Sequence, residues 1–538
     1  MPLPGPCPPL TDQALPFADR PQVWGGAMLK VVSIRSMYWS LPVMHPPTSR
    51  LRLKRALIAI ACWGLITSAC ATTPDAPAGT FVFKSADGQT TDAINGSFQV
   101  PENRTDPDSR MLTLRYVRFP ATTDTPGAPI IYLSGGPGGS GIQTAKRERF
   151  PLFMAMRQFG DVIALDQRGT GASDDTPVCE PTHVPSDAKA LTDAEYAAAF
   201  RVAALECAAF WKSRNIDLRG YNTMESVRDL DALRQQLGAD KISLWGISYG
   251  SHLALAALKQ LDQHLERIII ASAEGLDQTV KLPARTDAYF DRLQALLDSI
   301  PAAKAAYPDI KAMIARVHRA LEAKPVMLHL KSPNGQGTDL LLQRRTLQMI
   351  EGGAISDPEG ALQMLAVYSA ADAGDYRPIA GVLQQFFSPG APMTMRAMPL
   401  AMDVASGIDD QRLALVEQQA RTALLGDALN FSMPHLRDAF PELDLGDSFR
   451  AAPVSHVPTL LLSGTLDGRT YPDSHQEATA GLDQLQTITV VNAGHNLFMT
   501  TPEVTAAMQR FMRGEPVSAA MIVAPVSGFM PAPPAPAN

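Results

Sequence analysis

The sequence predicts an α/β fold in which a mostly parallel sheet carries helices on both faces and a large helical insertion interrupts the core. In the 538-residue chain, short apolar runs that end in glycine-rich turns alternate with segments of helical periodicity. This alternation is typical of buried parallel strands joined by helices. Residues 281–450 have a different texture, because they are rich in Ala, Leu, Met and Gln at helical spacing and carry few strand signals. We interpret this segment as a helical cap.

The overall composition indicates a globular protein with ample material for a buried core. Hydrophobic residues make up 46% of the chain and charged residues 19%. These values exclude a collagen, a fully disordered chain and a multi-span membrane protein. The 47 Lys and Arg residues against 54 Asp and Glu residues give a net charge of −7. Because nucleic-acid binding requires a basic face, we expect no nucleic-acid partner.

The N-terminal region has the features of an export signal. Residues 1–49 are Pro-rich and unpatterned, and a true start at Met28 or Met44 would make most of them a mis-assigned extension. A basic run at 50–55 precedes residues 56–69, which carry no charge. That stretch is shorter than a membrane span of about 20 residues, but it suits the apolar region of a signal peptide.

Two processing sites overlap at the end of this signal. Residues 66–70, Ile-Thr-Ser-Ala-Cys, resemble a bacterial lipobox, which would make Cys70 the lipidated first residue of the mature chain. Residues 69–71, Ala-Cys-Ala, also fit cleavage without a lipid. We therefore expect an exported protein, either periplasmic or anchored to the outer membrane through a lipid on Cys70, with secretion as the alternative.

The cysteine count agrees with export. Of the five cysteines, processing would remove Cys7 and Cys62 and assign Cys70 to the lipid, which leaves Cys179 and Cys207. A disulfide between these two is expected in an oxidising compartment. The alternative is two unrelated buried thiols.

These patterns divide the chain into consecutive segments. We expect an extension at 1–49, a signal peptide with its lipobox at 50–70, a linker at 71–79, a first core part at 80–280, the cap at 281–450, a second core part at 451–512 and a Pro/Ala-rich tail at 513–538. The predicted strands are 81–83, 112–117, 128–133, 162–165, 242–245, 268–271, 458–462 and 487–491. A helix is predicted over 224–237, with Thr223 as its N-cap and Gly238 as its stop.

The candidate nucleophile is Ser248, in the stretch Gly-Ile-Ser-Tyr-Gly at 246–250. An apolar strand precedes this stretch and a helical pattern follows it. Glycines two residues before and after the serine allow a sharp strand-to-helix turn, which holds the serine in a strained conformation with its Oγ exposed. Such a short motif also occurs in ordinary glycine-rich turns, so the presence of a base and an acid decides between the two readings.

A serine nucleophile needs a base, and the base needs an orienting carboxylate. One predicted strand runs into a turn that ends at Asp467, and the next runs into Gly494 and His495. Of the ten histidines, only His495 follows the carboxyl end of a predicted strand, where sites of open α/β sheets assemble. We predict Ser248, Asp467 and His495 as a catalytic triad, with Asp473 as the fallback acid.

Acyl transfer also needs donors directed at the developing oxyanion. The backbone N–H of Tyr249, directly after the nucleophile, is one expected donor. The glycine-rich loop at 134–141, Ser-Gly-Gly-Pro-Gly-Gly-Ser-Gly, should supply the other from Gly136, or from Gly135 as the next choice. A phosphate-binding loop is the competing interpretation, but the Gly-Lys-Ser/Thr ending of such loops is absent.

The run Asp166-Gln167-Arg168-Gly169 follows another predicted strand. An Asp–Arg pair at a strand end can brace the neighbouring loop through a charge-assisted hydrogen bond. We expect Asp166 and Arg168 to support the oxyanion loop in this way and to play no part in the chemistry.

Three motifs together carry a family resemblance. Residues 134–139, 166–173 and 246–250 occur in the order found in the proline iminopeptidase and tripeptidyl aminopeptidase branch of the α/β-hydrolases, which the chain resembles over 80–280 and 451–512. The resemblance implies hydrolysis of N-terminal residues or short N-terminal peptides under a helical cap, without a metal or other cofactor. The chain departs from the iminopeptidases at Ser134, where they usually carry His, and at 468–472, where the usual Pro-x-Thr-Pro ending is missing.

Two enzyme classes fit these residues, a serine aminopeptidase and a carboxylesterase that uses the same triad on small esters. A catalytically silent binding protein is the third reading, which the intact motifs disfavour. An aminopeptidase should place a carboxylate near the ammonium group of its peptide substrate. Glu274, which follows the apolar run 268–271, is the expected partner, and Glu351 in the cap is the alternate. A solvated loop acid is the competing interpretation of Glu274.

Overall fold

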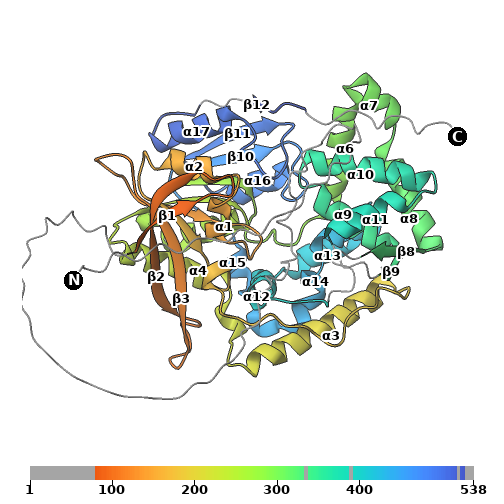
Figure 1. Ribbon diagram of the computed structural model, residues 1–538, viewed down its shortest axis with the longest axis horizontal. Coiled ribbons are helices and arrows are strands. Elements are labelled where there is room, and N and C mark those ends of the chain that lie inside the picture. Colours follow the sequence, from red (N-terminus) through yellow and green to blue (C-terminus); the bar gives the residue numbers. More distant parts are fainter. Residues whose placement is uncertain (1–78, 332–336, 387–391, 518–520, 527–538) are drawn as a thin grey trace, which may run out of the picture. The chain divides into compact units, whose positions relative to one another are not determined.

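The computed structural model describes residues 79–331, 337–386, 392–517 and 521–526 (Figure 1). The expected extension, the signal peptide and Cys70 lie outside these residues. The main feature is a 10-stranded sheet with the order β1-β2-β3-β5-β4-β6-β7-β10-β11-β12. Strands β1 to β3 are antiparallel, β3 pairs antiparallel with β5, and the strands from β5 to β12 in this order run parallel. The mostly parallel sheet of the sequence prediction is therefore present.

The strands and helices have the following bounds. The strands are β1 Thr80–Lys84, β2 Thr90–Pro101, β3 Met111–Phe119, β4 Ile130–Leu133, β5 Val162–Asp166, β6 Ile242–Ser248, β7 Leu265–Ala273, β8 Val326–Lys331, β9 Gly337–Leu342, β10 Thr459–Gly464, β11 Leu485–Val491 and β12 Ile522–Val523. The helices are α1 Gly141–Ala145, α2 Phe150–Met156, α3 Asp193–Lys212, α4 Thr223–Gln236, α5 Tyr249–Gln260, α6 Pro283–Asp298, α7 Pro301–Ala306, α8 Ile310–Ala323, α9 Arg344–Ala354, α10 Pro358–Asp372, α11 Arg377–Phe386, α12 Ala397–Ser406, α13 Asp410–Ala420, α14 Met433–Leu436, α15 Asp447–Arg450, α16 Pro472–Thr479 and α17 Pro502–Met512.

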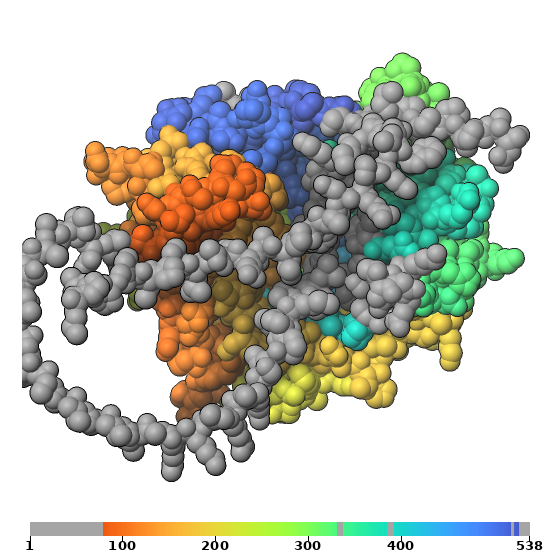
Figure 2. Space-filling view, in the orientation of Figure 1, coloured from red at the N-terminus to blue at the C-terminus, as the bar shows by residue number. Residues whose placement is uncertain are grey.

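Helices cover both faces of the sheet because its central strands are apolar on both sides. Along β6, Leu244 packs into the core formed with α4 and α5, whereas the next residue, Trp245, packs into the core formed with α2 and α17. Successive side chains of a strand point to opposite faces, so a continuous apolar run fills two separate cores. The edge strand β1 lies at the surface (Figure 2, orange-red), and its Val82 is 64% exposed.

The cap segment leaves the sheet after β7 and returns at β10, and these two strands pair directly with each other. Helices α6 to α11 of the chain between them surround a separate apolar core that contains Tyr289, Leu347 and Tyr368, whereas α12, α14 and α15 pack into the core that α4 and α5 form with the sheet. The cap segment also contains a two-stranded antiparallel hairpin, β8–β9, which the sequence pattern did not reveal. Each hairpin strand has six residues, too few for a periodicity to stand out from the surrounding helices.

The predicted helix at 224–237 is α4, but its N-cap is Asn222 and not Thr223. The Asn222 side chain accepts a hydrogen bond from the Glu225 backbone N–H at 2.9 Å, and Thr223 is the first helical residue. Both residue types cap helices well, so sequence alone could not separate two adjacent candidates. The helix stops as predicted before Gly238, whose φ of +64° suits glycine.

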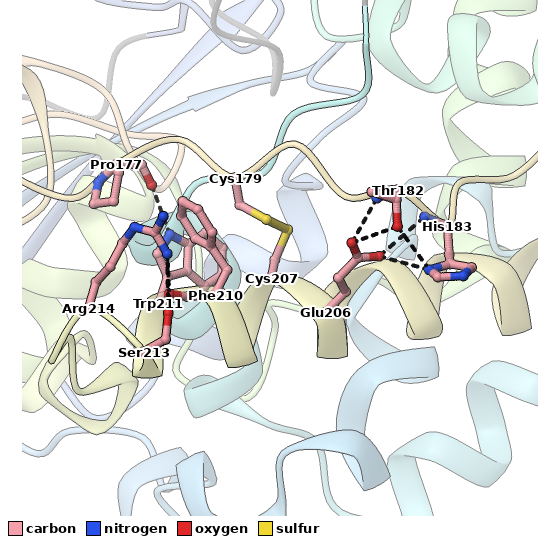
Figure 3. The surroundings of a disulfide bond; sticks show 10 residues. All are labelled: Pro177, Cys179, Thr182, His183, Glu206, Cys207, Phe210, Trp211, Ser213 and Arg214. Atoms are coloured by element: carbon pink, nitrogen blue, oxygen red, sulfur yellow. Dashed lines mark hydrogen bonds and ion pairs between the residues drawn. A yellow bond between two sulfur atoms is a disulfide. The ribbon is translucent and has the colours of Figure 1, made fainter.

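Cys179 and Cys207, the pair expected to be bridged, are joined by a disulfide in the structure, with their Cα atoms 5.6 Å apart (Figure 3). Cys207 lies on α3, and Cys179 belongs to the segment that runs beside this helix. Polar contacts fix the same segment, because Thr182 donates to the carboxylate of Glu206 and the indole N–H of Trp211 donates to the Pro177 carbonyl. The bridge therefore closes a loop that hydrogen bonds already order.

Within the described residues, no helix is both long and apolar enough to cross a membrane.

Loss of the disulfide should lower the free energy of unfolding. The bridge spans a sequence separation of 28 residues, for which loop-closure entropy gives about 3–4 kcal/mol. We expect the double variant Cys179→Ser/Cys207→Ser to unfold at a clearly lower urea concentration than the oxidised protein. Reductant should shift the oxidised protein to the midpoint of the variant, and identical midpoints for all three samples would contradict this prediction.

Candidate active site

Ser248 occupies a sharp turn between β6 and α5, as the motif predicts. Its backbone has φ +57° and ψ −129°, a region that non-glycine residues enter only with strain. The flanking glycines are required by close backbone contacts: a Cβ on Gly246 would lie 2.5 Å from the Gly250 carbonyl oxygen, and one on Gly250 would lie 2.1 Å from the Leu133 carbonyl oxygen. The hydroxyl of Ser251 donates to the Ser248 carbonyl at 2.5 Å and steadies the turn.

Asp467 and His495 meet at the carboxyl edge of the sheet. Asp467 follows β10, His495 follows β11, and the His495 Nδ1 lies 3.1 and 3.0 Å from the two carboxylate oxygens of Asp467. Two further contacts hold the His495 backbone: its N–H donates to the Ser356 carbonyl of the cap at 2.7 Å, and its carbonyl accepts from the Ser272 hydroxyl of β7 at 2.8 Å. The fallback acid Asp473 is exposed on α16 and does not contact His495.

The Asp467 carboxylate is completely buried and yet remains ionised. Burial alone would raise its pKa, but the charge and hydrogen bond of His495 and the backbone N–H of Thr470 hold the pKa well below its usual range. Arg469 N and Thr470 N donate to Oδ1 at 2.8 and 2.9 Å, and the Thr470 hydroxyl donates to Oδ2 at 2.8 Å. A carboxylate in this state can hold a histidine with its Nδ1 protonated and its Nε2 free to accept a proton.

No hydrogen bond joins Ser248 to His495 in the described part of the chain. Ser248 ends β6 and His495 follows β11. Both lie at the carboxyl edge of the sheet, since β6 pairs with β7, β7 with β10 and β10 with β11, all in parallel. Hydrogen bonds between a nucleophile and its base are often open in ligand-free enzymes and close when substrate binds. The structure thus brings two of the three predicted residues into contact and places the third at the same edge.

The glycine-rich loop lies directly against Ser248. A Cβ on Gly135 would lie 2.9 Å from the Ile247 carbonyl oxygen and 3.1 Å from the Ser248 Cβ, so only glycine allows this approach. Gly136 follows with φ +129°, again a glycine conformation. Tyr249 begins α5, where backbone N–H groups have no partner within the helix. The glycine-rich loop and the first turn of α5, which carry the two expected oxyanion donors, therefore both adjoin Ser248.

The expected pair between Asp166 and Arg168 does not form. Asp166 supports the glycine-rich loop alone, because its Oδ1 accepts from the Ser140 hydroxyl at 2.6 Å and from the Ile142 N–H at 3.0 Å. Gln167, between them, donates to the Ser134 carbonyl at 3.1 Å. Asp166 therefore supports the loop as expected, but through hydrogen bonds to uncharged groups and not through an ion pair with Arg168.

Arg168 is completely buried and points the other way. Its guanidinium forms two hydrogen bonds of 2.7 Å to Asp229 on α4 and lies 3.5 Å from Glu225. A buried guanidinium requires such a carboxylate partner, and Asp229 lies 61 residues further along the chain. Nothing in the local sequence pattern could have identified it.

Glu274, the expected partner for a substrate ammonium, follows β7 and is 8% exposed. Its carboxylate already forms an ion pair of 2.7 Å with the Lys281 ammonium. Burial opposes ionisation, but Lys281 and His252 together hold the pKa of Glu274 below its ordinary value. Glu274 is therefore a charged residue at the correct edge of the sheet, with most of its charge compensated by the protein.

Glu351, the alternate, is completely buried in α9, and neither carboxylate oxygen has a hydrogen-bond partner in the described residues. Burial raises its pKa to about 8. The side chain is therefore neutral at pH 7 and enclosed, which argues against the substrate-binding role expected from the sequence. Exposure cannot be read from a short pattern such as Met-Ile-Glu-Gly-Gly, which looks like a helix end.

Asp403 on α12 is an acid that the sequence analysis missed. Helix α12 packs on the glycine-rich loop, where a Cβ on Gly138 would lie 2.9 Å from the Pro399 side chain. Asp403 makes no hydrogen bond or ion pair within the described ranges. It keeps part of its surface accessible, but the surrounding protein desolvates it and raises its pKa to about 7, an effect that the charge of Glu274 increases. Burial likewise raises the pKa of Tyr249, and the charges of Asp403 and Glu274 add to this effect.

Glu351 should make stability depend on pH in an unusual direction. Its pKa is about 8 in the fold and about 4.3 in an unfolded chain, so the folded state binds the extra proton between these values. The free energy of unfolding should therefore fall as pH rises through this window, by at most about 1.4 kcal/mol per pH unit. Urea unfolding of Glu351→Gln at pH 5 and pH 8 should show a smaller loss than the unmodified protein, and parallel losses would contradict the assignment.

Comparison with known proteins places the chain in a family. Residues 128–502 match the family model of the alpha/beta hydrolase fold. The serine protease Hip1 of Mycobacterium tuberculosis is 30% identical over 188 residues, which is 34% of this chain and 36% of that protein. The tripeptidyl aminopeptidase of Streptomyces lividans is 26% identical over 186 residues, 33% of this chain and 34% of that protein.

The chain thus matches only about a third of the length of these curated relatives. A solved proline iminopeptidase-related protein from Thermus thermophilus is similar over 79% of this chain and 99% of its own length. The sequence identity is 16% and the TM-score is 0.35. The sequence resemblance is confirmed by the family match and the two relatives. The chain belongs to the alpha/beta hydrolase fold family.

Proposed function

We propose that the protein is an exported serine hydrolase that acts as an aminopeptidase and releases N-terminal residues or short N-terminal peptides. The observation that carries this proposal is the strained Ser248 turn at the same sheet edge as the hydrogen-bonded Asp467 and His495. The relatives named serine protease and tripeptidyl aminopeptidase support peptide-bond hydrolysis as the reaction.

The proposed reaction proceeds through an acyl-enzyme. The Ser248 Oγ attacks the carbonyl carbon of the scissile bond while the His495 Nε2 takes its proton, and the Asp467 carboxylate stabilises the resulting imidazolium. The N–H groups of Tyr249 and Gly136 stabilise the oxyanion. His495 then protonates the departing amine, the C–N bond breaks, and a water activated by the same histidine hydrolyses the acyl-enzyme.

Glu274 and Asp403 are the proposed partners of the substrate ammonium. Glu274 comes from the core, where its backbone N–H donates to the Ser251 hydroxyl at 2.9 Å, and Asp403 comes from α12 of the cap, which packs on the glycine-rich loop. An ammonium placed between them would favour the ionised form of Asp403, since an opposite charge lowers the pKa of a carboxyl group. Free N-termini would thus be bound by a charge that develops fully only when the substrate is present.

A carboxylesterase is the second candidate, and the ion pair between Glu274 and Lys281 favours it. In that reading Lys281 takes the place of a substrate ammonium, and a neutral ester binds without needing a further charge. The same nucleophile, base and oxyanion donors serve both reactions.

The substrate charge decides between these candidates. We expect cleavage of proline or tripeptide p-nitroanilides with a free amine, and little cleavage of the N-acetylated forms. Asp403→Asn and Glu274→Gln should lower kcat/KM on free-amine substrates, because the ammonium loses a partly desolvated partner. The loss should correspond to on the order of 2–5 kcal/mol of transition-state stabilisation. Their effect on p-nitrophenyl butyrate, a neutral ester, should be small.

Ser248→Ala is the control for this assay and should abolish cleavage of every substrate, with only a small residual rate above that in water. Cleavage that ignores N-acetylation, with equal losses in both carboxylate variants on amide and ester, would replace the aminopeptidase proposal by the esterase. Full activity of Ser248→Ala would overturn both.

Export should be visible in the mass of the native protein. If the signal is processed as proposed, the purified chain begins at Cys70 with an attached lipid or at Thr72 without one, and Cys179 and Cys207 are oxidised. Intact-mass and peptide mass spectrometry of protein purified from its own host check all three features. A chain that keeps residues 1–69 and has two free thiols would contradict export.

A further inference from the structure

A second histidine, His475, lies close to the Asp467 carboxylate. His475 belongs to α16 and has no exposed surface. Its Nε2 is 3.7 Å from the Asp467 Oδ2, too far for a direct hydrogen bond. The mechanism described above gives this side chain no role. Both nitrogens of a buried imidazole nevertheless require hydrogen-bond partners.

Both ring nitrogens of His475 have hydroxyl partners. Its Nδ1 is 2.7 Å from the Ser463 Oγ on β10, and its Nε2 is 3.1 Å from the Thr470 Oγ1. The Thr470 Oγ1 lies in turn 2.8 Å from the Asp467 Oδ2. A continuous chain of hydrogen bonds therefore runs from Ser463 through His475 and Thr470 to the proposed catalytic carboxylate.

The direction of every hydrogen bond in this chain follows from the carboxylate. Asp467 is ionised and can only accept, so the single hydroxyl proton of Thr470 is donated to it. The Thr470 oxygen must then accept from His475, which places the ring proton on Nε2. The unprotonated Nδ1 of His475 consequently accepts from the Ser463 hydroxyl, and all three side chains are satisfied in one arrangement.

His475 remains neutral in this position. Burial lowers its pKa to about 4, and the neighbouring His495 and Arg292 act in the same direction, against the opposing charge of Asp467. A neutral imidazole leaves the negative charge of Asp467 to the catalytic histidine. A cation at the same place would compete with His495 for that carboxylate.

We propose that His475 is a positioning residue that fixes the Thr470 hydroxyl as a donor to Asp467 and thereby holds this carboxylate in line with His495. The inference rests on the proposed serine hydrolase function and extends it to a residue that does not contact substrate. Without the His475 N–H to hold its oxygen, the Thr470 hydroxyl can turn away from Asp467, and its oxygen, which is 3.5 Å from the protonated His495 Nδ1, can then compete with the carboxylate for that proton.

The test compares His475→Ala with His475→Gln, whose side-chain amide can again donate to Thr470. We expect kcat to fall roughly 10-fold in the alanine variant, in line with the loss of one hydrogen bond at the reacting unit. KM should stay unchanged, and the glutamine variant should recover most of kcat. Ser463→Ala should also lower kcat, because His475 can then adopt the other tautomer, which does not donate to Thr470. The loss should be smaller than in His475→Ala, because the Nε2-protonated tautomer stays available.

A spectroscopic readout separates this inference from the proposed function. The proton shared by His495 Nδ1 and Asp467 should give a far-downfield proton NMR signal in the unmodified protein, with no substrate needed. His475→Ala should shift or broaden this signal, whereas His475→Gln should keep it. His318→Gln, at a buried histidine of the cap that contacts Tyr368, is the matched control and should leave kcat and the signal unchanged.

An unchanged kcat and an unchanged signal in His475→Ala would overturn the inference. If the unmodified protein cleaves no amide or ester, the proposed function fails, while the NMR comparison still decides the role of His475. If the alanine variant does not fold, the Ser463→Ala and His475→Gln variants decide it through the same two measurements.

Discussion

The site is organised around one negative charge that has no contact with solvent. Asp467 is completely buried, and an isolated carboxylate in such a place would be protonated or would destabilise the fold severely. The protein compensates the charge with two backbone N–H groups, one hydroxyl and one imidazole. Each donor has a fixed direction, so together they determine where the carboxylate lies and which nitrogen of His495 carries the proton. The tautomer of His495 that the proposed mechanism needs, with the proton on Nδ1, thus follows from the hydrogen bonds that hold the Asp467 carboxylate.

The cap takes part in this arrangement and does more than cover the sheet. The end of α9 and the turn after it contact both loops of the site: the Ser356 carbonyl accepts from His495 N, and Asp357 accepts from the backbone and side chain of Asn496 at 3.1 and 2.8 Å. On the other loop, Arg469 donates to the Gly352 carbonyl at 3.1 Å. Loss of cap structure would therefore release the loops that carry the acid and the base. The cap and the active edge of the sheet must become ordered together for the proposed chemistry to occur.

The sequence was most informative where chemistry and backbone geometry impose the same residue. Ser248 could be proposed because a sharp turn demands glycines at 246 and 250, and a Cβ on either glycine would indeed lie within 2.5 Å of a backbone carbonyl oxygen. His495 was identifiable by its place after a strand. Partners chosen by long-range packing were not: Arg168 pairs with Asp229, and the proposed substrate-binding residue Asp403 belongs to a helix more than a hundred residues beyond the serine. The burial of Glu351 was equally invisible, because it depends on how helices of the cap pack on each other.

In the proposed site, the groups that carry out the reaction and the groups that select the substrate come from different parts of the fold. The proposed nucleophile, base and acid follow three strands of the sheet, where a rigid scaffold holds them, whereas Asp403, which has no hydrogen bond or ion pair among the described residues, is carried by the cap. The core contributes Glu274, which is paired with Lys281, so in the proposed site the charge available to a substrate comes mainly from α12. If the proposal is correct, a relative with a different residue at this helix position would keep every group needed for acyl transfer and change only which substrate charge is favoured. The fold and the proposed triad can therefore be inferred from motifs, whereas the proposed substrate preference depends on the cap.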